Sequence, residues 1–282
     1  MRKNVFKRAT AVLLSAAAIA LAAPAVTASA APAEEFVHLK SGQRLNPGET
    51  LRSGDAALVM QWDGNLVLRL VNDQGQLGPE AWASGTYNNW AAYAYMQPDG
   101  NLVIYRQNGG PDQGGAVWHT GSWGHQGAEL TMLGGQLSIS DPSSYQRLWS
   151  LDAGFNPVRM GDGASQESFI NQNRGALTAG QWLRSNSVWL LMQQDGNLVL
   201  YRKRDGAALW STGTYGKPDQ ALFVANTKGN MYLRGLKNGV LTWTLSVPQS
   251  DGAYARLQND GNFVLYTGGG QPLWSSGTYG NW

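Results

Sequence analysis

Short stretches of alternating apolar and polar residues run along most of the chain and are interrupted by turn-forming residues. The alternation is plainest at 57–68 and 189–201, where it lies on both sides of an Asp-Gly-Asn segment. Successive strand residues point to opposite faces, so alternation around a turn predicts a β-hairpin. No eleven-residue window after residue 30 shows a helical stripe. The chain is therefore predicted to be all-β.

The hairpin pattern occurs six times. Four copies keep Gln, Asp, Asn and Val at alternate positions, and three of these end in Tyr. Copies follow one another at 32 to 36 residues within each half, and Gln61 and Gln193 lie 132 residues apart. A unit of about 35 residues was thus tripled, and the triplet was then duplicated. The copies begin at Gln61, Gln97, Met132, Gln193, Asn226 and Gln258.

The duplicated triplet predicts two domains, a first at 36–151 and a second at 169–282. The boundary between them is placed at 152–168, where several Gly and Pro residues break any regular pattern.

The first 30 residues have the pattern of a secretory signal peptide. Basic residues precede an apolar run at 9–23, and the small-residue sequence Ala28-Ser29-Ala30 follows it. The run is also short for a stable membrane span. We expect a signal peptide at 1–30, a mature chain that begins at Ala31 or Glu34, and a secreted, extracellular protein without membrane insertion.

Removal of that signal peptide changes the charge of the chain. The full sequence has 21 Lys and Arg against 19 Asp and Glu, and four of the basic residues lie in the signal; this leaves 17 against 19, a net charge of −2. No basic cluster remains, so nucleic acid is not an expected partner. The chain has no Cys, so its domains must be held by apolar burial without disulfides.

A short phrase that starts with Trp closes each unit. These Trp residues could stack on a sugar or could fill the core of a small domain. The phrase persists in the two altered units, which favours core packing, since Trp supplies a large apolar area. The six residues are Trp82, Trp118, Trp149, Trp210, Trp243 and Trp274.

The register of the hairpin decides which polar side chains gather. A two-residue turn at Asp99-Gly100 would turn Gln97 away from Val103 and Tyr105. A three-residue loop at 99–101 would instead pair Gln97 with Val103, with Tyr105 on the same face and Asp99 and Asn101 at its rim. We favour the three-residue loop, because it collects every repeated polar side chain in one patch.

Such a patch suits the chemistry of a sugar. A carboxylate accepts from hydroxyls, amides donate and accept, a phenol does either, and Val contacts ring carbons. One carboxylate among neutral amides is a poor calcium shell, so we expect no metal and no cofactor. Asp-Gly-Asn alone is a common turn, but a turn does not require the Gln and Tyr at its two ends. The pattern therefore favours a carbohydrate-binding site.

The pattern Gln-x-Asp-x-Asn-x-Val-x-Tyr, repeated at this spacing between Phe36 and Trp282, resembles the monocot mannose-binding, or bulb-type, lectin family. The resemblance implies two tandem β-prism (type II) domains, each of three four-stranded sheets with pseudo-threefold symmetry and one shallow site per sheet. It also implies that Asp and Asn contact the 2-hydroxyl of mannose, Gln the 3-hydroxyl and Tyr the 4-hydroxyl. The complete sites so implied are Gln97, Asp99, Asn101, Val103 and Tyr105; Gln193, Asp195, Asn197, Val199 and Tyr201; and Gln258, Asp260, Asn262, Val264 and Tyr266.

Three units depart from the pattern. The first has Arg69 in place of Tyr, and Arg donates but cannot accept, so this site is expected to be weaker. The third and fifth lack the carboxylate and are expected not to bind mannose. The first unit keeps Gln61, Asp63, Asn65 and Val67, the third has Met132, Gly134, Gln136 and Ser138, and the fifth has Asn226, Lys228, Asn230 and Tyr232. Plant relatives usually carry a disulfide in each domain, which this chain lacks.

The predicted function is a multivalent lectin that recognises mannose or mannose-containing glycans, and not an enzyme. His38, His119 and His125 form no catalytic pattern, and a glycosidase needs two carboxylates at one bond. The alternative is a lectin-like bacteriocin, which binds surface polysaccharide and kills related bacteria, because tandem bulb-type domains occur there too. A structural role with vestigial sugar binding is disfavoured by three complete motifs. Expected partners are mannose-type glycans or cell-surface polysaccharide, with a homodimer as a further hypothesis.

Overall fold

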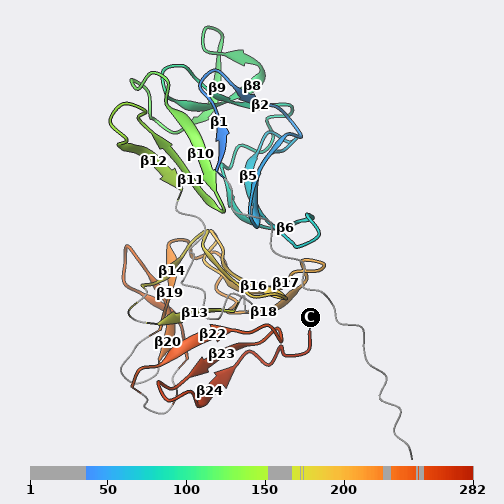
Figure 1. Cartoon of the computed structure of the whole chain (residues 1–282), viewed down its shortest axis with the longest axis vertical. Coiled ribbons are helices and arrows are strands. Elements are labelled where there is room, and N and C mark those ends of the chain that lie inside the picture. Colours follow the sequence, from blue (N-terminus) through green and yellow to red (C-terminus); the bar gives the residue numbers. More distant parts are fainter. Residues whose placement is uncertain are drawn as a thin grey trace, which may run out of the picture. The chain divides into compact units, whose positions relative to one another are not determined.

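The strands that the structure describes form six four-stranded antiparallel sheets (Figure 1). The computed structural model describes residues 36–151, 167–171, 173, 175–224, 230–245, 247 and 251–281. Apart from a 3₁₀ position at residue 173, the elements within these residues are strands, and no helix among them is long and apolar enough to cross a membrane. The predicted all-β class and the two β-prism domains are confirmed. The predicted signal peptide and most of the predicted boundary at 152–168 lie outside the described residues.

Three of the sheets use strands between residues 37 and 151 and form the first prism. In each sheet a short leading strand pairs with a three-stranded meander that comes later in the chain. The sheets are β1 (Val37–Leu39), β10 (Glu129–Leu133), β11 (Gln136–Ser140) and β12 (Arg147–Leu151); β2 (Arg44–Leu45), β7 (Tyr93–Met96), β8 (Leu102–Gly110) and β9 (Gly114–His119); and β3 (Thr50–Ser53), β4 (Ala56–Met60), β5 (Leu66–Val71) and β6 (Leu77–Ala83).

The second prism repeats this topology between residues 168 and 275. No described strand is exchanged between the two prisms, because each leading strand pairs within its own. The sheets are β13 (Ser168–Asn171), β22 (Tyr254–Leu257), β23 (Phe263–Tyr266) and β24 (Pro272–Ser275); β14 (Leu177–Thr178), β19 (Gln220–Val224), β20 (Met231–Gly235) and β21 (Leu241–Leu245); and β15 (Trp182–Arg184), β16 (Val188–Met192), β17 (Leu198–Arg202) and β18 (Ala208–Ser211).

Each sheet turns one face inward, as the alternating pattern requires. Leu66, Leu68 and Leu70 of β5 belong to the core of the first prism. The Trp residues of the closing phrases pack around the same cores: the ring centroids of Trp82 and Trp118 lie 5.9 Å apart, edge to face. Trp210, Trp243 and Trp274 form the equivalent cluster in the second prism. The core-packing interpretation of these residues is therefore confirmed.

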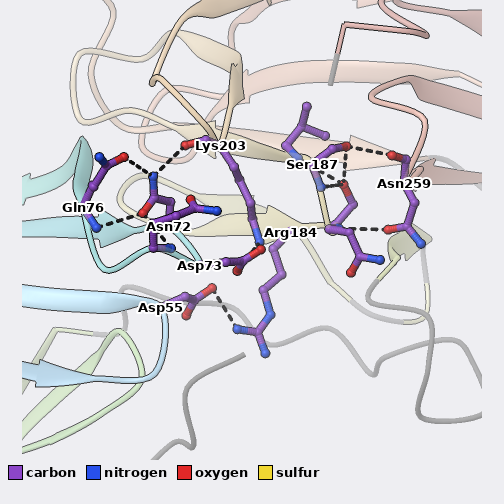
Figure 2. A network of polar contacts seen from close by, with 12 residues as sticks. Asp55, Asn72, Asp73, Gln76, Arg184, Ser187, Lys203 and Asn259 are labelled. Atoms are coloured by element: carbon purple, nitrogen blue, oxygen red, sulfur yellow. Dashed lines mark hydrogen bonds and ion pairs between the residues drawn. The ribbon is translucent and has the colours of Figure 1, made fainter. Parts of the chain in front are cut away.

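The outward face of the sheet β15–β18 is covered by residues of the first prism. Trp182, Trp189 and Leu191 are only 4%, 0% and 0% exposed and belong to the same apolar cluster as the core of the first prism. A network of polar contacts also joins residues of the two prisms (Figure 2). The carboxylate of Asp55 lies 2.9 Å from the guanidinium of Arg184, and both side chains are nearly buried.

The other end of this polar network contains a buried lysine (Figure 2). The Nζ of Lys203 lies 3.9 Å from Asp73, and the backbone oxygen of Lys203 accepts a hydrogen bond from the amide of Asn72. Burial lowers the pKa of the Lys203 ammonium below its usual value, while Asp73 and Asp55 act in the opposite direction.

We predict that Lys203 makes stability rise at alkaline pH. The native protein releases the Lys203 proton at a lower pH than the unfolded chain does, so the free energy of unfolding rises as pH increases from the native pKa toward about 10.5. Denaturant unfolding of wild type and Lys203→Met at pH 7 and pH 10 measures this effect. The free energy of unfolding of the wild type, relative to that of Lys203→Met, should be higher at pH 10 than at pH 7. The matched exposed variant Lys237→Met should show no such movement, and equal behaviour of both variants would contradict the prediction.

Candidate functional site

The hairpin that carries each complete motif has a three-residue loop, as predicted, but the loop begins one residue earlier than predicted. Tyr95 lies opposite Val103, and the backbone N–H of Gln97 donates to the oxygen of Asn101 at 2.9 Å. The loop is therefore 98–100, and the predicted pairing of Gln97 with Val103 is wrong by two positions. A shift of two residues preserves the faces, so Gln97, Asn101, Val103 and Tyr105 still share the outward face, as predicted.

Glycine closes this loop for a steric reason. Gly196, in the equivalent loop of the second prism, has a φ of 90°, which glycine adopts without strain. A Cβ at this position would also collide with the carbonyl oxygen of Lys217. The middle residue of Asp-Gly-Asn is thus fixed by turn geometry and by a neighbouring loop.

The Asp and Asn of the motif are held by a repeated set of hydrogen bonds. An oxygen of the Asp195 carboxylate accepts from the backbone N–H of Asn197 at 2.9 Å, and the same contact recurs at the three other complete turns. The side-chain oxygen of Asn197 accepts in turn from the hydroxyl of Thr212 and the backbone N–H of Thr214, both at 3.1 Å. The amide Nδ2 of Asn and the second oxygen of Asp are the groups that these contacts leave for a ligand.

The hydroxyl residues behind the motif were not singled out from the sequence. Thr214 is nearly buried, and its hydroxyl donates to the oxygen of Gly196 at 2.7 Å. A signal for them does exist, because a pair of Ser or Thr residues around one Gly follows the closing Trp only in the four units that keep Asp-x-Asn. The pairs are Ser84 and Thr86, Thr120 and Ser122, Thr212 and Thr214, and Ser276 and Thr278.

We predict that Thr214→Val destabilises the turn. The substitution keeps the shape of the side chain but leaves the buried oxygen of Gly196 without its 2.7 Å donor, which should lower the free energy of unfolding by about 1–2 kcal/mol. Thr214→Ser is the matched control and should stay close to wild type, since Ser122 fills the equivalent position in the second unit. Denaturant unfolding checks both variants, and equal losses would show that the hydroxyl is not the cause.

The Gln and Tyr ends of the motif contact each other on the outward face. The amide of Gln193 donates to the hydroxyl of Tyr201 at 2.8 Å, and the second and sixth units have the same bond. Burial raises the pKa of the Tyr201 phenol, against a smaller lowering by Gln193, so the phenol stays protonated at neutral pH. Tyr105 is only 5% exposed, and burial, Tyr93 and Asp99 raise its pKa.

Each complete candidate site thus unites one carboxylate, two amides, one phenol and one apolar side chain at the end of a hairpin. The groups can donate and accept at neighbouring positions, which vicinal hydroxyls require. Among the described residues, no group of three or more His, Asp or Glu side chains could hold a metal ion.

Two curated plant proteins are similar to most of the chain. A mannose-specific lectin 2 of Colocasia esculenta is 30% identical over 240 residues, which cover 85% of this chain and 84% of that protein. A mannose-specific lectin 1 of Remusatia vivipara is 30% identical over 235 residues, which cover 81% and 83%. The chain belongs to the monocot mannose-binding, or bulb-type, lectin family.

Solved structures of lectins are also similar to the chain. A Scilla campanulata agglutinin, described as a fetuin-binding two-domain lectin, is 26% identical and covers 85% of this chain and 98% of its own, with a TM-score of 0.33. A Gastrodia elata lectin is 30% identical and covers 40% of this chain and 94% of its own, with a TM-score of 0.32. No family model matches the chain. Lectins of this family bind carbohydrate without catalysis, so the prediction of a non-enzymatic protein is confirmed.

The first unit of the lectin has an altered candidate site. Arg69 occupies the Tyr position, and its guanidinium donates to the backbone oxygen of Gly78 at 3.0 Å. Glu80 lies opposite Arg69 in the sheet; burial raises the pKa of Glu80, against a lowering by Arg69. Gln61, Asp63, Asn65 and Val67 keep the hairpin geometry of the other sites, with Asn65 opposite Gln61. This site therefore has a cation and a second carboxylate in place of a phenol.

The hairpin of the third unit is one residue shorter than the repeat positions Met132, Gly134, Gln136 and Ser138 imply. Leu133 pairs with Gln136 around the two-residue turn Gly134-Gly135, and Met132 is fully buried in the core. Met132 thus corresponds to Met60 of the first unit and not to Gln61. In the fifth unit, Asn226 and Lys228 lie outside the described residues.

The candidate site of the fourth unit borders the first prism. Trp189 lies opposite Tyr201 and Leu191 opposite Val199, and both apolar side chains are fully buried. The side-chain oxygen of Gln194 also accepts from the backbone N–H of Ala83 at 3.0 Å. Gln193, Asp195 and Asn197 at the hairpin end remain at least partly exposed. The hairpin end is therefore the exposed part of this candidate site.

Proposed function

We propose that this lectin binds mannose and mannose-containing glycans at the complete motifs of its second, fourth and sixth units. The observation that supports the proposal most is the recurrence of one constellation in three sheets: an Asp-to-Asn turn bond of 2.9–3.0 Å and a Gln-to-Tyr bond of 2.8–3.1 Å. Packing of the fold does not need an exposed carboxylate at three equivalent places. The mannose specificity of the two plant relatives supports the same ligand.

Each site should bind a single sugar weakly, because every hydroxyl contact replaces a contact with water. Several sites on one chain can engage one branched glycan, and the second contact then forms at a high effective concentration. We therefore propose a multivalent binder that favours polymeric mannose over the free sugar. The signal-like first 30 residues support secretion as its route to extracellular glycans.

Retention of the mature protein on mannose-agarose, with elution by free methyl α-mannoside, tests this function. Specific elution of folded protein is the expected result. Flow-through of protein that unfolds cooperatively would contradict mannose binding and direct the search to other sugars on a glycan array. The bacteriocin alternative uses the same sites, and a growth-inhibition assay on bacteria that the protein coats separates binding from killing.

A further inference from the structure

An exposed aromatic side chain accompanies every complete Asp-x-Asn turn. It follows directly after the Ser or Thr pair of the closing phrase, and the third and fifth units lack both the pair and the ring. Exposure of such large rings to water is unfavourable in free energy, and these rings do not pack in the core. The four residues and their exposed fractions are Tyr87 at 61%, Trp123 at 59%, Tyr215 at 71% and Tyr279 at 72%.

The loop that carries each ring is fixed to the turn on both sides of the ring. Before Tyr215, the hydroxyl of Thr214 donates to the oxygen of Gly196 at 2.7 Å. After Tyr215, the backbone N–H of Lys217 donates to the backbone oxygen of Asp195 at 2.9 Å. The backbone of Tyr215 therefore lies beside the turn that carries the carboxylate and the amide of the candidate site.

The same two anchors hold the other three loops. The hydroxyl that precedes the ring donates to the Gly oxygen of the turn at 2.7–2.8 Å in each unit. A backbone N–H one or two residues after the ring donates to the Asp oxygen at 2.8–3.1 Å. The hydroxyl donors are Thr86, Ser122 and Thr278, and the N–H donors are Asn89, His125 and Gly280.

An exposed ring at the rim of a polar site has a definite chemical use. The face of an aromatic ring is electronegative, and the C–H groups on one face of a pyranose are weakly electropositive and apolar. The primary site already has Val for contact with ring carbons, so an additional aromatic surface at its rim suits a second sugar residue.

We propose that Trp123, Tyr215 and Tyr279 are stacking platforms for the pyranose residue next to the one held by the Gln, Asp, Asn and Tyr of their motif; Tyr87 occupies the equivalent place beside the altered first site. The lectin would then bind an oligosaccharide better than a monosaccharide at each individual site, before any multivalency. This inference rests on the proposed function, because it deepens the ligand class of the same sites from mannose to a mannose-containing oligosaccharide.

The test compares two ligands on one set of variants. Trp123→Ala, Tyr215→Ala and Tyr279→Ala are combined, and titration calorimetry measures methyl α-mannoside and a linear mannotriose. We expect unchanged affinity for the monosaccharide and about three- to tenfold weaker binding of the trisaccharide, the range of an aromatic contact. The corresponding Phe variants keep a ring and should bind the trisaccharide as the wild type does. Tyr145→Ala removes an 85% exposed Tyr from the third unit and should change neither affinity.

Three results for the triple Ala variant would overturn the proposal. The first is unchanged affinity for the trisaccharide, and the second is an equal loss of affinity for both ligands. The third is loss of self-association in sedimentation without loss of sugar affinity. The equal loss would place the rings in the primary site, and the last would make them a contact between copies. If the wild type binds neither mannoside, the proposed function fails first. The ring variants are then compared with the wild type on whichever oligosaccharide a glycan array identifies.

Discussion

Simultaneous replacement of Asp99, Asp195 and Asp260 by Ala is expected to abolish retention on mannose-agarose. Each carboxylate is the only charged acceptor of its motif, and hydrogen bonds to ionised groups are the strongest a sugar hydroxyl can form there. Ala also removes the acceptor of the turn N–H, which lies 2.9–3.0 Å from the Asp oxygen, so the free energy of unfolding should fall by about 1 kcal/mol per site.

The corresponding triple Asn variant separates the two effects. Its amide oxygen can still accept from the turn N–H, so its stability should stay near that of the wild type while mannose binding is lost. Unfolding curves of both variants measure the effect on stability, and their retention on the column measures the effect on mannose binding. Mannan binding by the folded triple Ala variant would show that the site residues are assigned wrongly.

Asp55→Ala is expected to have the largest effect on stability of any single change discussed. Asp55 is 7% exposed and pairs at 2.9 Å with Arg184, which is 8% exposed, so its loss removes a carboxylate from beside a buried cation. Removal of one partner of a buried pair typically costs about 3–5 kcal/mol. Asp55 also accepts from the indole N–H of Trp182 at 3.4 Å.

Two comparisons make that prediction specific. Asp73→Ala removes a 30% exposed carboxylate that lies 3.9 Å from Lys203, beyond hydrogen-bond distance, and should cost less than Asp55→Ala. Asp55→Leu combined with Arg184→Met replaces the pair by apolar groups and should recover most of the loss. Denaturant unfolding measures all three variants, and a loss for Asp55→Ala no greater than that for Asp73→Ala would contradict the argument.

The sequence predicts the sheets and the composition of the sites because repetition amplifies weak signals. One Asp-Gly-Asn turn is ambiguous, but four copies at a regular spacing define hairpins and place Gln, Val and Tyr on one face. The loop boundary was beyond this reasoning, since loops at 98–100 and 99–101 differ by a shift that leaves every face unchanged. The strand register, with Tyr95 opposite Val103, and the hydrogen bond from Gln97 to Asn101 distinguish them.

Contacts between distant units are the part that the sequence did not predict. Trp189 and Leu191 alternate along β16 like the outward residues of the other hairpins, and only tertiary structure shows that they are fully buried. The position of Met132 in the third unit was predicted wrongly for a similar reason. Its hairpin is one residue shorter, which places Met132 at the core position next to the motif. Local pattern defines a strand and its two faces, but not what covers the outer face.

The pairing of β1 with β10 has a consequence for how the chain acquires its structure (Figure 1). Val37 lies beside Met132, so the first strand of the first prism pairs with a strand close to the end of that prism. During synthesis β1 must wait, unpaired, until residues 129–133 have left the ribosome. Closure of such a long loop is slow because its entropy is lost before the contacts form. The nascent prism therefore stays open through most of its translation, and each hairpin unit can form before the ring of three sheets is closed.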